Sequence, residues 1–284
     1  VRARPAGGSA GKALSGCGAG GPGMPQAVAA RASHVAPDAP RCPAGHLVTP
    51  KTRATVVVAL FAGPPAVVLG VIGYLVEGIA AGVVVFVVVA AVMACSAWFG
   101  GGRRVASIVR GRPADPARDA RLCNLVEGLA IGAGVRQPRL RVVDSPGLNA
   151  LAAGSSQGRA MIAVTTGLLA ELGRVELEAV LAEELMQIRR DEALPATVLA
   201  ATFGVGRSFA LRPDHDAEAD RGAVALTRYP PALAAALEKI DSKGAEVAGM
   251  PAGLAHLWLA DPTGSPNARG RLALHERIEA LREL

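Results

Sequence analysis

Aromatic side chains are scarce in this sequence, and its cysteines form no recognisable motif. Phe, Trp and Tyr make up only 3% of the 284 residues, whereas nucleic-acid-binding surfaces typically combine basic side chains with stacking aromatics. The four cysteines, Cys17, Cys42, Cys95 and Cys123, contain no C-x-x-C pair, which argues against a disulfide framework or a zinc ribbon. Cys42 and His46 are spaced to ligate a metal, but the sequence around them supplies no partner ligands. We expect neither a nucleic-acid partner nor a cysteine-based metal site.

Charged side chains are absent from two long apolar runs, residues 54–76 and 79–99. Each run has the roughly 20 residues that an α-helix needs to cross a bilayer core of ~30 Å. Only the pair Glu77-Gly78 separates them. The sequence therefore predicts a transmembrane helical hairpin in a lipid bilayer, with the first span as a retained anchor and a kink at its two consecutive prolines. The alternative is a buried hairpin in the core of a soluble protein.

Composition and charge divide the chain into three parts. Residues 1–53 are rich in Gly, Ala, Pro and Arg and contain seven basic residues against one acid, which predicts a disordered basic arm. Residues 54–102 comprise the hairpin and contain one acid and no basic residue. Residues 103–284 contain 23 basic and 22 acidic residues and form the predicted folded domain. The near neutrality of this domain also argues against nucleic-acid binding.

The basic residues next to the hairpin predict its orientation. Lys51 and Arg53 precede the first span, and Arg103 and Arg104 follow the second. Because Lys and Arg are enriched on the cytoplasmic side of membrane spans, both flanks are expected in the cytoplasm. The charge pattern therefore predicts a multi-pass membrane protein whose C-terminal domain is cytoplasmic.

Local patterns predict a mostly helical α+β domain with a small β-sheet after the hairpin. Apolar periodicity and β-branched runs mark helices at 119–132 and 175–190, strands at 140–143 and 161–164, and a turn region at 149–154. The stretch 193–211 is apolar but interrupted by Pro and Gly. We expect a soluble or membrane-apposed helix there, with one further span as the alternative.

The predicted helix 175–190 contains the segment E-E-L-M-Q, from Glu183 to Gln187. Glu184 falls on an apolar stripe at helical spacing, so its carboxylate is expected to be partly buried. Glu183 and Gln187 are i, i+4 neighbours on the adjoining strip. This is the spacing of two metal ligands on one helix face, although an ordinary solvated acidic pair is the alternative.

Motifs in consistent order over roughly residues 115–284 resemble the HtpX-like membrane metallopeptidases, relatives of the CAAX prenyl protease. The matching segments are 122–129, 138–144, 149–154 (N-A-L-A-A-G), 162–169, 176–182, 218–220 (E-A-D), 232–240 and 276–281 (E-R-I-E-A-L). In that family the segment matching 176–182 runs directly into H-E-x-x-H. The resemblance implies a zincin-like metallopeptidase domain behind the hairpin and a place in a bacterial-type plasma (inner) membrane.

The resemblance also implies a zinc site that this chain has altered. In H-E-x-x-H the two imidazoles bind Zn²⁺ and the glutamate is the general base for the metal-bound water. Glu184 keeps the base position, but the ligand positions are Glu183 and Gln187. Glu218 matches the third ligand and Asp220 a residue that supports it. Because an amide oxygen is a weak zinc ligand, no zinc cofactor is expected, and the carboxylates would suit Mg²⁺, Ca²⁺ or Mn²⁺ better.

Further expectations concern the surroundings of this site. Three converging carboxylates favour proton uptake or a partner arginine, for which Arg189 and Arg190 are candidates. His215 is either a substitute ligand or part of a polar helix start with Asp214 and Asp216. By resemblance, strand 160–164 lies at the edge of the substrate cleft, with Ala163 and Asn149 as cleft residues. The family's H-P-P before the last motif is replaced by R-L-A at 271–273.

Three functions follow from these patterns. The first is a pseudopeptidase, a membrane-anchored homologue that holds peptide or membrane-protein segments without cutting them. The second is an active metalloendopeptidase of membrane-protein quality control with a non-standard metal site, in which Glu184 is the base. The third is a purely structural anchor, which would predict erosion of the cleft strand and the E-A-D segment, yet both are retained.

Overall fold

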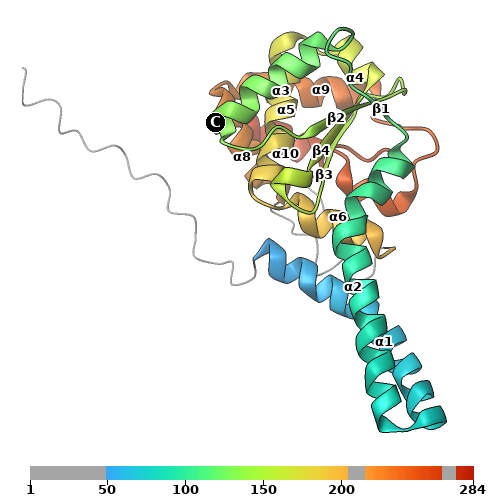
Figure 1. The fold of residues 1–284 in the computed structure, drawn as a ribbon. Coiled ribbons are helices and arrows are strands. Elements are labelled where there is room, and N and C mark those ends of the chain that lie inside the picture. Colours follow the sequence, from blue (N-terminus) through green and yellow to red (C-terminus); the bar gives the residue numbers. More distant parts are fainter. Residues whose placement is uncertain (1–48, 204–214, 264–272) are drawn as a thin grey trace, which may run out of the picture. The chain divides into compact units, whose positions relative to one another are not determined.

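The computed structural model describes residues 49–203, 215–263 and 273–284 (Figure 1). The predicted disordered arm lies outside the described residues except for its last few, and Pro50 to Arg53 already belong to the first helix. Cys17, Cys42 and His46 also lie outside the described part. The three-part division of the chain stays a prediction.

The predicted hairpin is present as α1 (Pro50–Glu77) and α2 (Ile79–Val109), which are joined by Gly78. The side chain of Thr49 caps α1 by accepting a hydrogen bond from the backbone N–H of Thr52 at 3.2 Å. The two prolines lie inside α1, and Figure 1 shows α1 changing direction along its length. α2 continues without a break past residue 102 into the C-terminal part (Figure 1).

The outward faces of α1 and α2 are apolar and exposed. Leu75, Val76 and Ile79 are 75%, 74% and 74% exposed, whereas a core hairpin of a soluble protein would bury such side chains. By length and composition both helices are candidate membrane spans. They approach closely at Gly82, where an added Cβ would lie 2.8 Å from the carbonyl oxygen of Gly70. Close approach at small residues is typical of helix packing in membranes.

The small sheet has four strands in the order β1-β2-β4-β3. The strands are β1 (Arg112–Pro113), β2 (Arg139–Val143), β3 (Ala150–Ala153) and β4 (Met161–Thr165). β4 runs parallel to β2 and antiparallel to β3. The strands expected at 140–143 and 161–164 are therefore confirmed, but the turn expected at 149–154 is wrong. Its Ala-rich sequence has weak strand propensity, and pairing with β4 makes it a strand.

The remaining elements are mostly helices, so the expected α+β class is confirmed. They are α3 (Ala120–Ala133), α4 (Thr166–Glu171), α5 (Arg174–Arg189), α6 (Ala193–Ala201), α8 (His215–Thr227), α9 (Pro230–Lys243), α10 (Leu274–Arg282) and the 3-10 helices η2 (Gln157–Arg159) and η3 (Ala252–Leu257). α5 packs against α3, α8, α9 and β3. Its apolar residues, such as Leu177 and Leu181, belong to the main core. The helix that carries the candidate site is thus an interior helix.

Helix α6 connects the domain to the hairpin. It has 9 residues, too few to span a bilayer, and it packs against both α1 and α2. The expected helix in 193–211 is therefore confirmed for Ala193–Ala201, and residues 204–211 lie outside the described part. A buried ion pair reinforces this junction, because Arg53 of α1 donates to both carboxylate oxygens of Glu192 at 2.7 and 2.6 Å.

A second ion pair stabilises the start of α3 and should make the stability of the protein depend on pH. Arg112 donates to both oxygens of Asp119 at 2.6 and 2.8 Å, and this bond, aided by the backbone N–H of Asp115, lowers the pKa of Asp119 from 3.8 to about 2. A lowered folded-state pKa stabilises the protein above pH 3.8, and the stabilisation fades as the pH falls toward 2. We expect Asp119→Asn to cost about 1 kcal/mol at pH 7 and progressively less below pH 4.

Thermal unfolding in detergent at pH 7, 4 and 3 measures the difference in stability between the wild type and Asp119→Asn. The matched control is Asp241→Asn at an exposed carboxylate, which should change stability little at each pH. If the stability difference between the wild type and Asp119→Asn did not change with pH, it could not come from the ion pair of Asp119 with Arg112.

Candidate functional site

The three residues of the degenerate motif are buried on α5. Glu183 and Glu184 are 0% exposed, and Gln187 is 7% exposed. The alternative of a solvated acidic pair is therefore wrong, and Glu184 is buried more completely than its place on the apolar stripe predicts. Burying a carboxylate is costly unless hydrogen bonds or a nearby cation compensate it. The surroundings of these side chains therefore determine what the site can do.

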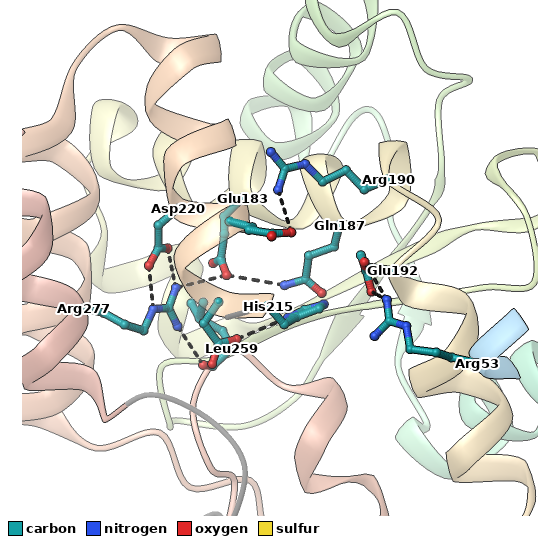
Figure 2. Close-up of polar contacts among 11 residues, drawn as sticks. Arg53, Glu183, Gln187, Arg190, Glu192, His215, Asp220, Leu259 and Arg277 are labelled. Atoms are coloured by element: carbon teal, nitrogen blue, oxygen red, sulfur yellow. Dashed lines mark hydrogen bonds and ion pairs between the residues drawn. The ribbon is translucent and has the colours of Figure 1, made fainter. Parts of the chain in front are cut away.

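Glu183 is bound by a guanidinium group. Oε1 of Glu183 lies 3.0 Å from Nη2 of Arg277, which comes from α10. The same oxygen accepts a hydrogen bond of 3.4 Å from the side-chain amide of Gln187. Figure 2 shows these contacts, with Arg277 pointing between Glu183 and Asp220. The side chains at two of the family's ligand positions are thus hydrogen-bonded to each other, and Glu183 is also paired with a cation.

Arg277 forms its strongest contacts with Asp220 of the E-A-D segment. Nε donates to Oδ2 of Asp220 at 2.9 Å, and Nη2 donates to Oδ1 at 2.6 Å. Nη1 reaches the carbonyl oxygen of Leu259 at 3.4 Å. Burial alone would lower the pKa of Arg277, but the charges of Asp220 and Glu183 raise it well above its usual value. A permanently charged guanidinium therefore joins α5, α8 and α10 inside the protein.

Glu218, the third ligand position, has a different partner. Oε2 of Glu218 lies 3.4 Å from Nη1 of Arg190, and both side chains are partly exposed. The expected pairing with a nearby arginine is confirmed for Arg190 and Glu218. Arg277 was not assigned any role from the sequence. The available signal was its place in the matching segment 276–281, which shows resemblance but not which side chain Arg277 would meet.

His215 lies in the first turn of α8. Its Nδ1 is 3.4 Å from Oδ1 of the neighbouring Asp216 (Figure 2). Asp216 is buried inside the first turn, and Asp214 lies outside the described residues. The role of His215 as a substitute ligand stays a prediction.

The two predicted cleft residues are fully buried. Asn149 donates its side-chain N–H groups to the carbonyl oxygens of Ala245 and Ala260 at 2.9 and 2.8 Å, and so ties β3 to two later segments of the chain. Ala163 lies in β4, which is paired on both sides by β2 and β3. β4 is thus an inner strand whose backbone is already paired with β2 and β3, and the expected place of 160–164 at the edge of the substrate cleft stays a prediction. The cleft roles of Asn149 and Ala163 stay predictions.

The outer side of the edge strand β3 is already bonded to other parts of the chain. Leu151 forms an antiparallel bridge with Trp258, and the N–H of Leu259 donates to the carbonyl oxygen of Ala150 at 2.8 Å. Just after β3, the N–H of Gly154 donates to Oγ1 of Thr197 in α6 at 2.8 Å. An added peptide strand would have to replace these bonds.

Comparison with known proteins agrees with the motif order. The sequence matches the model of Peptidase family M48 over residues 116–237, which includes Glu183, Glu184 and Glu218. It is 32% identical over 208 residues to "Protease HtpX homolog" of Dictyoglomus turgidum (strain DSM 6724 / Z-1310), a match that covers 57% of this chain and 68% of that protein. The chain belongs to the HtpX-like M48 peptidases. The "Protease HtpX homolog" of Tropheryma whipplei (strain TW08/27) is 29% identical over 69% of this chain and 83% of its own length.

Membership in the M48 family, whose members are zinc metallopeptidases, allows the donor set to be tested against zinc. Zinc in such sites is bound by neutral imidazole and carboxylate. Here Glu183 is bonded to Arg277, Gln187 supplies an amide, and Glu218 is bonded to Arg190. Within the described residues no three His, Cys, Asp or Glu side chains are grouped to hold a metal ion. The residues present do not fit the zinc ion of this M48 family.

Proposed function

We propose that this chain is a membrane-anchored M48 pseudopeptidase, which keeps the family scaffold and binds peptide or membrane-protein segments without cutting them. The observation that carries the proposal is the guanidinium of Arg277, held at 3.0 Å from Glu183 and in two hydrogen bonds to Asp220. In this arrangement the carboxylate at the first ligand position neutralises a protein cation instead of a metal ion.

Electrostatics explains why this arrangement disfavours zinc. Two unit charges of the same sign at 4 Å repel by about 4 kcal/mol at the effective dielectric of a protein, and a dication doubles the repulsion. Arg277 cannot lose its proton to relieve it, because its pKa is raised well above the usual value. Binding a metal at Glu183 would therefore require breaking a buried ion pair, which is itself costly.

The same contacts weigh against the alternative of a harder metal. Such a metal would use Glu183 and Glu218 as its charged ligands, but each already has an arginine at 3.0 and 3.4 Å. Glu184 retains the general-base position and is fully buried. A base in that position needs an activated water to deprotonate, and this donor set offers no site that would activate one.

The binding role rests on the hairpin and on the retained scaffold. The apolar faces of α1 and α2 support insertion in a bacterial plasma membrane as a multi-pass protein, and the flanking basic residues favour a cytoplasmic domain. Strand addition at β3 would compete with Trp258 and Leu259. We therefore infer that a bound segment either displaces residues 257–259 or contacts the membrane-facing helices.

Metal analysis of the purified chain tests the loss of the zinc site. We expect the wild type to hold far less than one equivalent of Zn²⁺ after dialysis against buffered zinc, measured by plasma mass spectrometry. Glu183→His together with Gln187→His is expected to hold about one equivalent, because it supplies two neutral imidazoles at i, i+4, no longer requires an ion pair to Glu183 to be broken, and leaves the charge of Arg277 compensated by Asp220. Adding Glu218→Ala to that double variant should again abolish stoichiometric zinc.

A measurement of proteolytic activity completes this test. A wild type that binds a metal stoichiometrically and cleaves a membrane-protein substrate, with cleavage abolished by Glu184→Gln, would overturn the pseudopeptidase proposal in favour of a working endopeptidase. Absence of zinc in the double-histidine variant would show that Arg277 or other changes, beyond the two missing imidazoles, block the site.

A further inference from the structure

A cavity of about 690 Å³ lies where the end of α2 meets the sheet. Its wall contains five arginines and no Asp or Glu. They come from three separate parts of the chain: Arg103 and Arg110 from α2 and its C-terminal cap, Arg139 and Arg141 from β2, and Arg159 from η2. Arg139 and Arg141 share one face of their strand because side chains alternate along a strand.

The described residues provide no carboxylate partner for these five guanidinium groups. Arg141 donates to the backbone carbonyl of Gly111 at 2.6 Å, and Arg159 lies 5.2 Å from the ring centre of Phe99. By contrast, Arg53 and Arg277 each bond a carboxylate. A concave surface with charges of one sign concentrates the electrostatic potential and attracts the opposite charge. The ligand of this cavity should therefore be an anion.

The position of the cavity along α2 indicates the source of that anion. Phe99 ends the uncharged run and is 55% exposed. Arg103 lies four residues further along the same helix. At a rise of 1.5 Å per residue, Arg103 lies about 6 Å beyond the end of the apolar span. The headgroup layer of one leaflet is roughly 5 to 8 Å thick. Arg103, the first arginine of the cavity along α2, thus lies at the depth of lipid phosphates when α2 crosses the bilayer.

We propose that this cavity binds the phosphate of an anionic phospholipid from the leaflet next to the C-terminal end of α2. Guanidinium groups donate paired N–H bonds to phosphate oxygens, and several can share one headgroup. Phe99 and Met161 supply apolar surface in the wall for the lipid's glycerol and upper acyl chain. The cavity is larger than a free phosphate ion requires. The inference depends on α1 and α2 crossing a membrane and is independent of whether the chain cleaves peptides.

Binding of short-chain lipids to the full chain in neutral detergent tests this proposal. Isothermal titration would compare dioctanoyl phosphatidylglycerol, dioctanoyl phosphatidylcholine and inorganic phosphate. We expect phosphatidylglycerol to bind at least tenfold more tightly than the other two. Arg139→Gln with Arg159→Gln should weaken phosphatidylglycerol binding by about tenfold or more, since each basic residue near a membrane surface contributes on the order of 1 kcal/mol to anionic-lipid attraction.

A charge-matched control separates the cavity from the general charge of the protein. Arg174→Gln with Arg221→Gln removes two exposed arginines outside the cavity and should change the affinity less than twofold. Equal weakening by both double variants, or equal binding of the two lipids, would overturn the proposal. Inorganic phosphate that binds as tightly as phosphatidylglycerol would assign the cavity to a soluble anion instead. Because these arginines lie apart from positions 183, 187 and 218, we expect the variants to leave zinc content unchanged, and this test and the pseudopeptidase test can fail or succeed separately.

Discussion

Arg277→Met is expected to lower the free energy of unfolding by about 3 to 5 kcal/mol. The substitution removes the cation that bonds Asp220 at 2.9 and 2.6 Å and Glu183 at 3.0 Å. Both carboxylates are buried, so neither can exchange the guanidinium for bulk water. Chemical or thermal unfolding of the purified chain in detergent measures the effect. A loss of this size would be a large fraction of the stability of a typical domain.

Two companion variants show whether the charge or the packing of Arg277 is responsible. Arg282→Met on the same helix removes an arginine bonded to Glu238, but that pair is largely exposed, so a cost below about 1 kcal/mol is expected. Arg277→Met combined with Glu183→Gln and Asp220→Asn removes the buried charges together and should recover most of the loss. If Arg277→Met alone lowered the free energy of unfolding no more than Arg282→Met does, the central role of this cation would be contradicted.

Arg53→Met is expected to cost about 3 kcal/mol or more, because it also leaves a buried carboxylate without its cation, here at the junction between the hairpin and α6. Arg53 and Glu192 are both buried and joined by two hydrogen bonds of 2.7 and 2.6 Å. Arg53 belongs to the first turn of α1, whereas Glu192 directly precedes α6. The pair therefore holds the hairpin against α6, and its loss should also speed limited proteolysis in the connection between α5 and α6.

The control for this junction is a neighbouring, exposed ion pair. Lys51 lies 3.8 Å from Asp191 and is 71% exposed, so Lys51→Met should change stability by less than about 1 kcal/mol. Arg53→Met with Glu192→Met replaces both buried charges by apolar groups and should restore most of the stability. If the double variant were as unstable as Arg53→Met, packing and not an isolated buried charge would explain the loss.

Elements with strong local signals were predicted well from the sequence. The hairpin followed from two uncharged runs, and α3, α5, β2 and β4 followed from periodicity or β-branched runs. The segment Ala150–Ala153 was expected as a turn because alanine carries little strand propensity. It becomes a strand through its pairing with the nearby β4, and the bonds of Asn149 to Ala245 and Ala260 depend on residues 96 and 111 positions away. Such pairing cannot be read from a local pattern.

The candidate site likewise combines features that can be read from the sequence with features that appear only in the folded chain. The loss of both imidazoles at positions 183 and 187, and the retained Glu184, are visible in the sequence alone. The pairing of Glu218 with Arg190 could be anticipated because both lie near the motif helix. The bond between Glu183 and Arg277 could not be anticipated, since the two residues are 94 positions apart (277 − 183) and only the folded chain brings them together.

The sequence by itself determined the helical hairpin of two candidate membrane spans, the membership in the HtpX-like M48 peptidases and the absence of imidazoles at positions 183 and 187, because these depend on side-chain type and on spacing within one element. The tertiary structure alone decided which cation bonds Glu183, which strand forms the edge of the sheet, and where five arginines converge. The physical reason is that charge pairing, strand addition and cavity formation depend on distances between elements, and these distances exist only after the core has packed.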